Sequence, residues 1–138
     1  MQQKVVVIIV TYNGSKWLNK CLQSLEKSIL PVSVIAIDNA SMDSSVEILR
    51  QFSFVEVIQS QTNLGFGKAN NIGIQKALEQ NFDYYFLLNQ DTWIEPDTIN
   101  NLDAVALENE KLVIVSPMHF SQDEISFDAN FEMYWKRK

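Results

Sequence analysis

The sequence predicts an α/β fold in which helices cover both faces of a mostly parallel sheet. Short apolar runs of strand length alternate with longer amphipathic segments along most of the 138 residues. Strict alternation of strands and helices is typical of parallel sheets, because parallel strands need a crossover connection. The first run, Val5–Val10, is apolar at every position, which indicates a strand buried on both faces.

The expected strands follow from apolar runs rich in β-branched and aromatic residues. They lie at residues 5–10, 32–37, 55–58, 84–88 and 112–115. The sequence shows no internal repeat, linker or low-complexity segment. We therefore expect residues 1–138 to form a single domain.

Helices are expected between these strands, each with its apolar residues on one face. The first spans 15–30, and the second begins near Ser44, which has capping-box spacing to Glu47. The third runs from about 68 to 80, and Pro96 suits the first turn of the fourth. The residues expected to face inward include Trp17, Cys21 and Ile29 in the first helix, Val46, Leu49 and Phe52 in the second, Ala69, Ile72, Gly73 and Ala77 in the third, and Ile99, Leu102, Val105 and Ala106 in the fourth.

Charge and composition exclude several classes of function. The net charge is −6, which disfavours a nucleic-acid partner, since binding to a phosphate backbone needs a basic face. No apolar stretch approaches the ~18 residues of a membrane span. The single cysteine, Cys21, cannot form an intramolecular disulfide, so we expect a cytoplasmic location. Only two arginines are present, so backbone N–H groups, a lysine or a metal ion would have to hold any bound diphosphate.

Polar residues follow the expected strands at their carboxyl ends, where ligands bind in open parallel sheets. A Walker A phosphate loop is excluded, because Gly67-Lys68 lacks the G-x-x-x-x-G-K-[ST] spacing. The polar segments are Thr11-Tyr12-Asn13-Gly14, Asp38-Asn39-Ala40-Ser41, Asn63-Leu64-Gly65-Phe66-Gly67-Lys68-Ala69-Asn70-Asn71 and Asn89-Gln90-Asp91-Thr92.

These four segments, in this order and spacing, resemble the family 2 glycosyltransferases of the GT-A fold over residues 5–117. The resemblance is closest to a bacterial branch that includes rhamnosyltransferases. It implies a Rossmann-like sheet and an enzyme of cell-wall or polysaccharide biosynthesis. Such an enzyme transfers a sugar from a UDP-, dTDP- or GDP-linked donor to a hydroxyl of a glycan or lipid-linked acceptor, with inversion. Peripheral binding at the inner face of the membrane and homo-oligomer formation are compatible with this resemblance.

The resemblance assigns nucleotide-sugar contacts to residues of all four segments. Asp38 would accept a hydrogen bond from a base N–H or a ribose hydroxyl, which suits a carboxylate because it only accepts. Lys68 would pair with the diphosphate, although a solvated helix-surface lysine is an equally good interpretation. The complete set implied by the resemblance is Thr11, Tyr12, Asn13, Asp38, Asn39, Gly65, Lys68, Asn70 and Asn89.

Asn89-Gln90-Asp91 stands where the family has a D-x-D metal motif. Asp91 would hold Mg²⁺ or Mn²⁺, and the cation would stabilise the diphosphate as a leaving group. Asn89 replaces the first aspartate and offers only a neutral oxygen. One carboxylate can suffice, since Mg²⁺ often takes one or two protein carboxylates plus phosphate oxygens and water.

The general base that an inverting enzyme needs is not identified in this sequence. The acidic residues after Pro117 stand in no context typical of the family; they are Asp123, Glu124, Asp128 and Glu132. An aromatic set with helix-compatible spacing would need a cover; it consists of Phe127, Phe131, Tyr134 and Trp135. We therefore expect the chain to be incomplete relative to the length of the family.

Two alternatives belong to other functional classes. A non-catalytic GT-A-like binding or assembly module would keep the fold and lack the general base. A nucleotidyltransferase would also use a parallel sheet and metal carboxylates, but we would expect a glycine-rich loop with arginine or lysine after the first strand. Thr11-Tyr12-Asn13-Gly14 has no such residues, so the nucleotidyltransferase is the weaker alternative.

Overall fold

The computed structural model describes residues 3–109 and 111–135. The chain divides into two compact units, one of residues 1–100 and one of residues 101–138. The first unit contains the sheet and all residues predicted to bind nucleotide sugar or metal. The expectation that all 138 residues form one domain stays a prediction.

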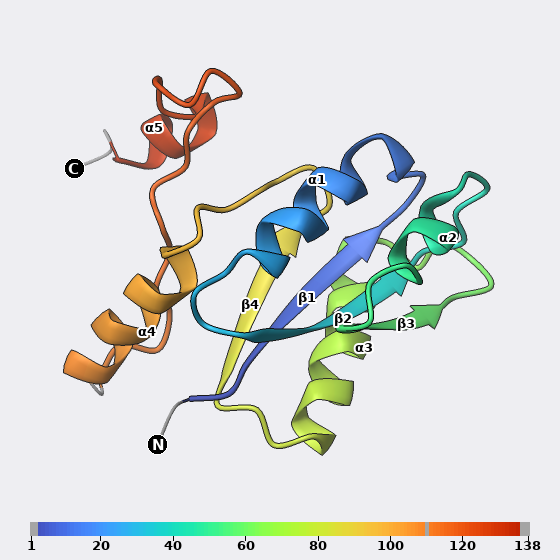
Figure 1. Cartoon of the computed structure of the whole chain (residues 1–138), viewed down its shortest axis with the longest axis horizontal. Coiled ribbons are helices and arrows are strands. Elements are labelled where there is room, and N and C mark those ends of the chain that lie inside the picture. The colour runs from blue at the N-terminus through green and yellow to red at the C-terminus, as the bar shows by residue number, and fades with distance from the viewer. Residues whose placement is uncertain (1–2, 110, 136–138) are drawn as a thin grey trace. The chain divides into compact units, whose positions relative to one another are not determined.

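The first unit is built on a sheet with the strand order β3-β2-β1-β4 (Figure 1). Each neighbouring pair of strands is parallel. The strands are β1 (Val5–Thr11), β2 (Val32–Asp38), β3 (Val55–Gln59) and β4 (Tyr84–Asn89). The central position of β1 explains its continuous apolar run, because both of its faces are covered.

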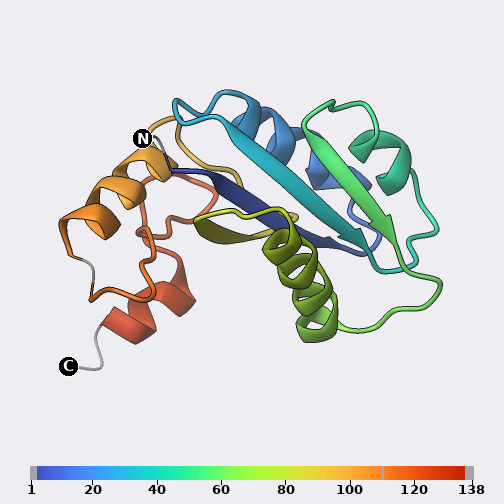
Figure 2. The same cartoon turned by 90° about the horizontal axis from the view of Figure 1, so that it is seen from below.

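Helices cover both faces of this sheet (Figure 2). On one face, α1 (Ser15–Glu26) and α2 (Ser45–Leu49) share a core with Val5, Val7 and Ile9 of β1. On the other face, α3 (Phe66–Glu79) packs against Val6 and Ile8. Alternate residues of β1 thus enter opposite cores, and the predicted parallel α/β architecture is confirmed.

Gly73 allows α3 to approach the sheet closely. A Cβ atom at this position would lie 2.6 Å from Cγ2 of Ile8 and 2.7 Å from Cδ1 of Ile37. Any larger residue would have to push the helix away from the strands or displace these core side chains.

Several details of the predicted helices are wrong. α1 ends at Glu26, so Ile29 lies outside it, and its side chain is 64% exposed rather than inward-facing. Its backbone N–H donates to the carbonyl oxygen of Pro96 at 2.8 Å. Ser44 precedes α2 as predicted, but no side-chain hydrogen bond caps that helix. Ile72 of α3 is 37% exposed, not inward-facing.

α4 (Thr98–Glu108) begins two residues after Pro96, not around it. Ile99 at its start is buried with the α1-side core, as predicted. Val105, also predicted to face inward, is 46% exposed.

The predicted strand at 112–115 is wrong. These residues form no strand, and the side chains of Val113 and Ile114 are 93% and 86% exposed. A four-residue apolar run becomes a strand only where a neighbouring strand can bond with it. Among the described residues of the second unit, the β pairing is an isolated antiparallel bridge between Phe120 and Phe127.

The second unit also contains α5 (Ala129–Trp135), in agreement with the helical spacing of its aromatic residues. The ring of Phe131 lies 6.0 Å from that of Phe127 and 5.1 Å from that of His119. The predicted aromatic roles of Tyr134 and Trp135 concern side chains outside the described residues. In the part of the chain that the structure describes, no helix has both the length and the apolar character needed to span a membrane.

Candidate functional site

The carboxyl ends of β1, β2 and β4 lie side by side at one edge of the sheet. In register, Thr11 pairs with Asp38 of β2, and Val10 pairs with Asn89 of β4. The chain leaves β1 toward β2 and later returns to the opposite side of β1 with β4. Such a reversal of strand order opens the crevice in which open α/β sheets bind their ligands.

Gln90 is not among the predicted site residues, yet its side chain joins the ends of β1 and β4. Its Oε1 accepts hydrogen bonds from the Thr11 hydroxyl at 2.6 Å and the Tyr12 backbone N–H at 3.1 Å. Its Nε2 donates to the Tyr12 carbonyl oxygen at 3.4 Å. Gly14 makes room for this side chain, since a Cβ there would lie 2.2 Å from Oε1. No local sequence signal reveals this role, because the partners are 78 and 79 residues apart.

The loops that follow β1 and β2 are tied together by side-chain hydrogen bonds. The Asn13 N–H donates to Ser41 Oγ at 2.9 Å, and Asn13 Oδ1 accepts from the Met42 N–H at 2.9 Å. The Gly14 N–H donates to Ser45 Oγ at 2.8 Å. Asn13 also has a positive φ of 49°, a region that asparagine tolerates. Its amide oxygen therefore shapes the loop, and its predicted ligand contact stays a prediction.

Asp43 fastens the same loops at the start of α1. Its carboxylate accepts hydrogen bonds from the N–H groups of Ser15 and Ser45, both at 3.0 Å, and from the Ser45 hydroxyl. Desolvation raises the pKa of the Asp43 carboxyl, but the hydrogen bonds from Ser45 and Ser15 outweigh it. The net effect lowers the pKa from 3.8 to about 2.

Asp38 lies at the end of β2 with a carboxylate oxygen that lacks a protein partner. The side chain is 1% exposed, and its Oδ2 accepts a hydrogen bond from the Ser41 N–H at 3.2 Å. Oδ1 is buried and has no hydrogen-bond partner among the described residues. A buried acceptor without a donor is costly, so this atom is suited to receive an N–H or O–H group of a ligand.

Asn39 holds the loop that leads into α3. Its Oδ1 accepts a hydrogen bond from the Leu64 N–H at 3.1 Å, and its Nδ2 donates to the Gly65 carbonyl oxygen at 3.4 Å. Gly65 has a φ of 79°, a conformation that glycine adopts without a steric penalty. The amide oxygen and nitrogen of Asn39 thus both bond within the protein, and its predicted contact with a nucleotide sugar stays a prediction.

The other predicted residues of this region differ in their exposure. The side chains of Tyr12 and Lys68 are exposed at the surface. Asn70 is buried, and its Nδ2 donates to the Phe66 carbonyl oxygen one turn back at 3.0 Å. Its nitrogen is therefore engaged within α3. The predicted contacts of Asn70 with a nucleotide sugar and of Lys68 with a diphosphate stay predictions.

Asn89 and Asp91 are both exposed where the chain turns after β4. α1 fastens the segment that follows. The Ser24 hydroxyl accepts a hydrogen bond from the Ile94 N–H at 3.1 Å, and the Lys20 ammonium lies 3.2 Å from the centre of the Trp93 ring. The chain is thus fastened to α1 shortly after Asp91.

Cys21 lies beneath this turn. Its thiol is buried and donates a weak hydrogen bond to the Asn89 carbonyl oxygen at 3.8 Å. Burial, and to a smaller extent the negative charge of Asp91, raises the pKa of this thiol to about 12. The thiol is therefore protonated at neutral pH, and we exclude it as a metal ligand or nucleophile.

The donor set at the turn fits a cation that is shared with a ligand. Among the described residues, no three histidine, cysteine, aspartate or glutamate side chains gather closely enough to hold a metal ion. An exposed carboxylate at Asp91 with an amide oxygen at Asn89 can bind Mg²⁺ or Mn²⁺ if phosphate oxygens and water complete the shell.

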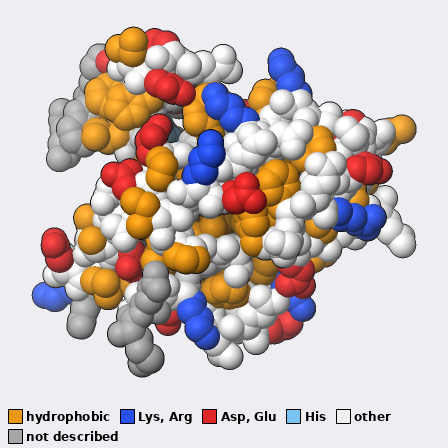
Figure 3. Space-filling model, viewed as in Figure 1, with side chains coloured by type: hydrophobic (Ala, Val, Ile, Leu, Met, Phe, Trp, Pro, Cys, Tyr) orange, Lys and Arg blue, Asp and Glu red, His pale blue; other side chains and the backbone are white. Residues whose placement is uncertain are grey.

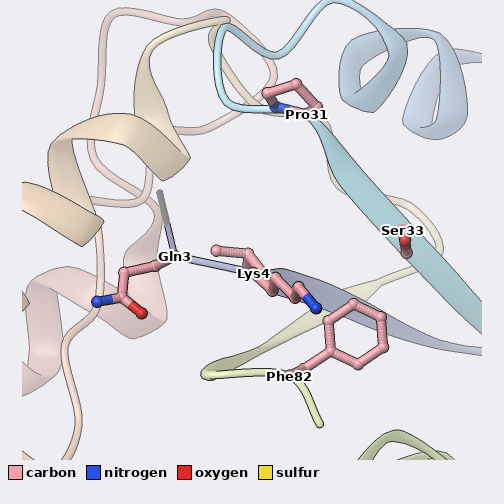
Figure 4. A pocket seen from close by; sticks show the side chains of 6 residues that line it. Gln3, Lys4, Pro31, Ser33 and Phe82 are labelled. Carbon is pink, nitrogen blue, oxygen red and sulfur yellow. The ribbon is translucent and has the colours of Figure 1, made fainter. Parts of the chain in front are cut away.

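A positive charge lies close to the turn that carries Asp91, since the Lys20 ammonium lies over the ring of Trp93. Basic and acidic side chains are interspersed on the face shown in Figure 3. A hollow of about 250 Å³ lies at the opposite end of the sheet, near the amino ends of β1 and β2 (Figure 4). Its lining residues are Gln3, Lys4, Val5, Pro31, Ser33 and Phe82. None of them belongs to the predicted site.

A parallel α/β sheet with polar residues at its switch point is typical of ligand-binding α/β proteins, and comparison with known proteins specifies the family. Residues 6–137 match the model of glycosyl transferase family 2. The chain therefore belongs to this family.

Individual relatives agree with this membership. The chain is 29% identical to the dTDP-rhamnosyl transferase RfbF of Shigella flexneri over 125 residues. The matched region covers 90% of this chain and 41% of RfbF. The chain is 26% identical over 132 residues to the glycosyltransferase GlyA of Streptococcus pneumoniae, covering 92% of this chain and 18% of GlyA. The chain thus spans less than half the length of each of these relatives.

Solved structures share the fold. TarS residues 1–349 of S. aureus, in complex with UDP-GlcNAc, has a TM-score of 0.71 at 23% identity, over 86% of this chain and 38% of that one. The mannosyltransferase PcManGT of Pyrobaculum calidifontis, in complex with GDP-Man and Mn²⁺, has a TM-score of 0.69 at 20% identity, over 77% of this chain and 33% of that one. These likenesses confirm the predicted GT-A fold.

Proposed function

We propose that the sheet edge formed by β1, β2 and β4 binds a nucleotide-diphosphate sugar together with a divalent cation. The bound sugar would be transferred to an acceptor hydroxyl with inversion. The observation that carries this proposal is the buried, unpartnered Oδ1 of Asp38 at the carboxyl end of β2. Tyr12, on the neighbouring strand end, offers an exposed aromatic ring to the base. Family membership and the nucleotide-sugar complexes of related folds support the same conclusion.

The nucleotide would be recognised by Asp38 at the carboxyl end of β2. Asp38 Oδ1 can only accept hydrogen bonds while ionised, so its partner is an N–H of the base or a hydroxyl of the ribose. The other oxygen is already held by the Ser41 N–H, which fixes the direction of the carboxylate. Asn39 keeps the loop at Leu64 and Gly65 beside this strand end. This part of the binding surface would therefore be in place before the nucleotide sugar binds.

The cation would be held by Asp91, with Asn89 as a neutral oxygen ligand. When bound, Mg²⁺ or Mn²⁺ would stabilise the negative charge on the departing diphosphate. The protein's own contribution is to aim one carboxylate at the diphosphate, and the attachment of residues 93 and 94 to α1 limits the movement of the turn. Lys68 would add a positive charge from the start of α3.

The acceptor and the donor sugar are proposed only by class. RfbF is named as a dTDP-rhamnosyl transferase. TarS is named as a poly(ribitol-phosphate) beta-N-acetylglucosaminyltransferase. We propose a glycan or lipid-linked acceptor and a UDP-, dTDP- or GDP-linked donor for this family member. Peripheral membrane association and homo-oligomer formation stay predictions, as does the identity of the general base.

Isothermal titration of the folded chain with UDP, dTDP and GDP, each with and without Mn²⁺, tests the proposal. We expect at least one nucleotide to bind, and to bind more tightly with Mn²⁺. Asp38→Asn should weaken that binding about 10- to 100-fold with or without Mn²⁺, because a charge-assisted hydrogen bond is lost. Asp91→Asn should instead abolish the Mn²⁺ enhancement.

Glu26→Gln is the matched control, since this exposed carboxylate lies at the far end of α1 and its loss should leave binding unchanged. Absence of binding by any of the three nucleotides to a folded sample would contradict the proposed function.

A further inference from the structure

The side chain of Gln90 extends the pairing of β1 and β4 beyond the end of the strands. The last backbone pair of the two strands is Val10 with Asn89. Two residues after Val10, Tyr12 directs its N–H and its carbonyl oxygen to the side-chain amide of Gln90, at 3.1 Å and 3.4 Å. The side-chain amide therefore takes the place of a backbone peptide group. The backbone of β4 is free to turn, and the Thr92 N–H closes that turn onto the Asn89 carbonyl oxygen at 3.1 Å.

Three features make glutamine specific for this position. The Tyr12 N–H can only donate, so an acceptor must face it, and the Tyr12 carbonyl oxygen needs a donor. The Thr11 hydroxyl, which is fully buried, donates to the same Oε1. Gly14 leaves the space that the amide occupies. An apolar residue would leave the buried hydroxyl of Thr11 without this partner, at a cost of about 1–3 kcal/mol.

The amide of Gln90 thus connects the two halves of the candidate site. Tyr12 offers the exposed ring for the base, and Asp91, the residue after Gln90, offers the carboxylate for the cation. We propose that Gln90 is a positioning residue that fixes Asp91 relative to Tyr12 and so couples cation binding to nucleotide binding. This inference rests on the proposed function and goes beyond it, because it assigns a role to a residue that would touch neither ligand.

The test compares Gln90→Leu and Gln90→Glu by two measurements. The first is the ratio of the nucleotide dissociation constants without and with Mn²⁺, from titration with the tightest of UDP, dTDP and GDP. The second is the hydrogen-exchange rate of the Tyr12 amide, measured by NMR. We expect Gln90→Leu to lower the Mn²⁺ ratio about tenfold, within the usual range of coupling between sites, and to accelerate Tyr12 exchange.

Gln90→Glu keeps an acceptor for the Thr11 hydroxyl and the Tyr12 N–H but offers no donor to the Tyr12 carbonyl oxygen. We therefore expect the Tyr12 amide to keep its slow exchange and the Mn²⁺ ratio to lie above that of Gln90→Leu. Gln23→Leu, at an exposed position of α1, is the matched control and should change neither quantity. If Gln90→Leu does not fold, Gln90→Asn replaces it, because its amide is one methylene too short to reach all three partners.

The outcomes separate the possible errors. A normal Mn²⁺ ratio in a Gln90→Leu variant with fast Tyr12 exchange would mean that Gln90 stabilises the strand end only, and the positioning role would be overturned. The positioning role would also be overturned if the Gln23→Leu control lowered the Mn²⁺ ratio as much as Gln90→Leu does. Absence of nucleotide binding by the unmodified chain would refute the proposed function itself, and this inference with it.

Discussion

Replacing Gly14 with alanine should destabilise the sheet unit by about 2 kcal/mol through a clash with the Gln90 amide. The new Cβ would lie 2.2 Å from Gln90 Oε1 and 2.5 Å from Thr11 Oγ1. The backbone conformation at this position is compatible with alanine, because Gly14 has a φ of −96° and a ψ of 8°, which alanine also adopts. The cost therefore arises from the displaced side chain.

The magnitude follows from the bonds that the clash would break. Gln90 makes three hydrogen bonds at this point, each worth about 1 kcal/mol. Alanine recovers up to about 1 kcal/mol because it restricts the unfolded chain more than glycine does. The remaining loss of about 2 kcal/mol should lower the urea midpoint by about 1 M, for a slope of about 2 kcal/mol/M.

Gly67→Ala is the matched control for this experiment. A Cβ at Gly67 would meet no atom within 4 Å, and the residue lies in the first turn of α3. Alanine is a better helix former than glycine, so the stability should stay the same or rise. Equal midpoints for Gly14→Ala and Gly67→Ala in urea would refute the packing of Gln90 against Gly14.

Two further predictions follow from the titrating groups around the site. Cys21, whose pKa is raised to about 12 by burial and by the charge of Asp91, should resist a thiol reagent at pH 8 in the native protein and react fully in urea; fast labelling without denaturant would contradict its burial. Asp43→Asn should reduce stability at neutral pH, because the pKa of Asp43 is depressed to about 2. The stabilisation is present above the ordinary pKa of 3.8 and is lost as the pH falls toward 2. The difference in urea midpoint between Asp43→Asn and the unmodified chain should therefore narrow from pH 5 to pH 2, and a constant difference would count against this role.

Much of the sheet unit could be predicted because local signals and tertiary structure agree there. The run at 5–10 is apolar throughout since both faces of β1 are covered, and the structure extends it only to Thr11. The strand at 84–88 likewise needs only one more residue. The run at 112–115 has the same apolar character but lies outside any sheet, with Val113 93% exposed. A local sequence pattern indicates that a segment favours the strand conformation. It does not show whether another strand lies beside that segment to pair with it.

The location of the candidate site could be predicted from the sequence, but the hydrogen bonds that hold its loops together could not. Polar segments after buried strands predicted which edge of the sheet to examine, and Asp38 lies there with an unpartnered oxygen. The roles of Gln90, Ser41 and Asp43 depend on hydrogen bonds to residues that are distant in the sequence. These bonds exist only once the strands are assembled, so no spacing rule could select the three residues in advance.

The most direct test of the proposed site is a crystal structure of this chain soaked with the tightest-binding nucleotide sugar and Mn²⁺. We predict density for the base or ribose within hydrogen-bond distance of Asp38 Oδ1, and for a cation at the carboxylate of Asp91. Clear nucleotide density elsewhere, such as in the hollow beside Lys4 and Phe82 at the opposite end of the sheet, would contradict the assignment of this edge as the binding site.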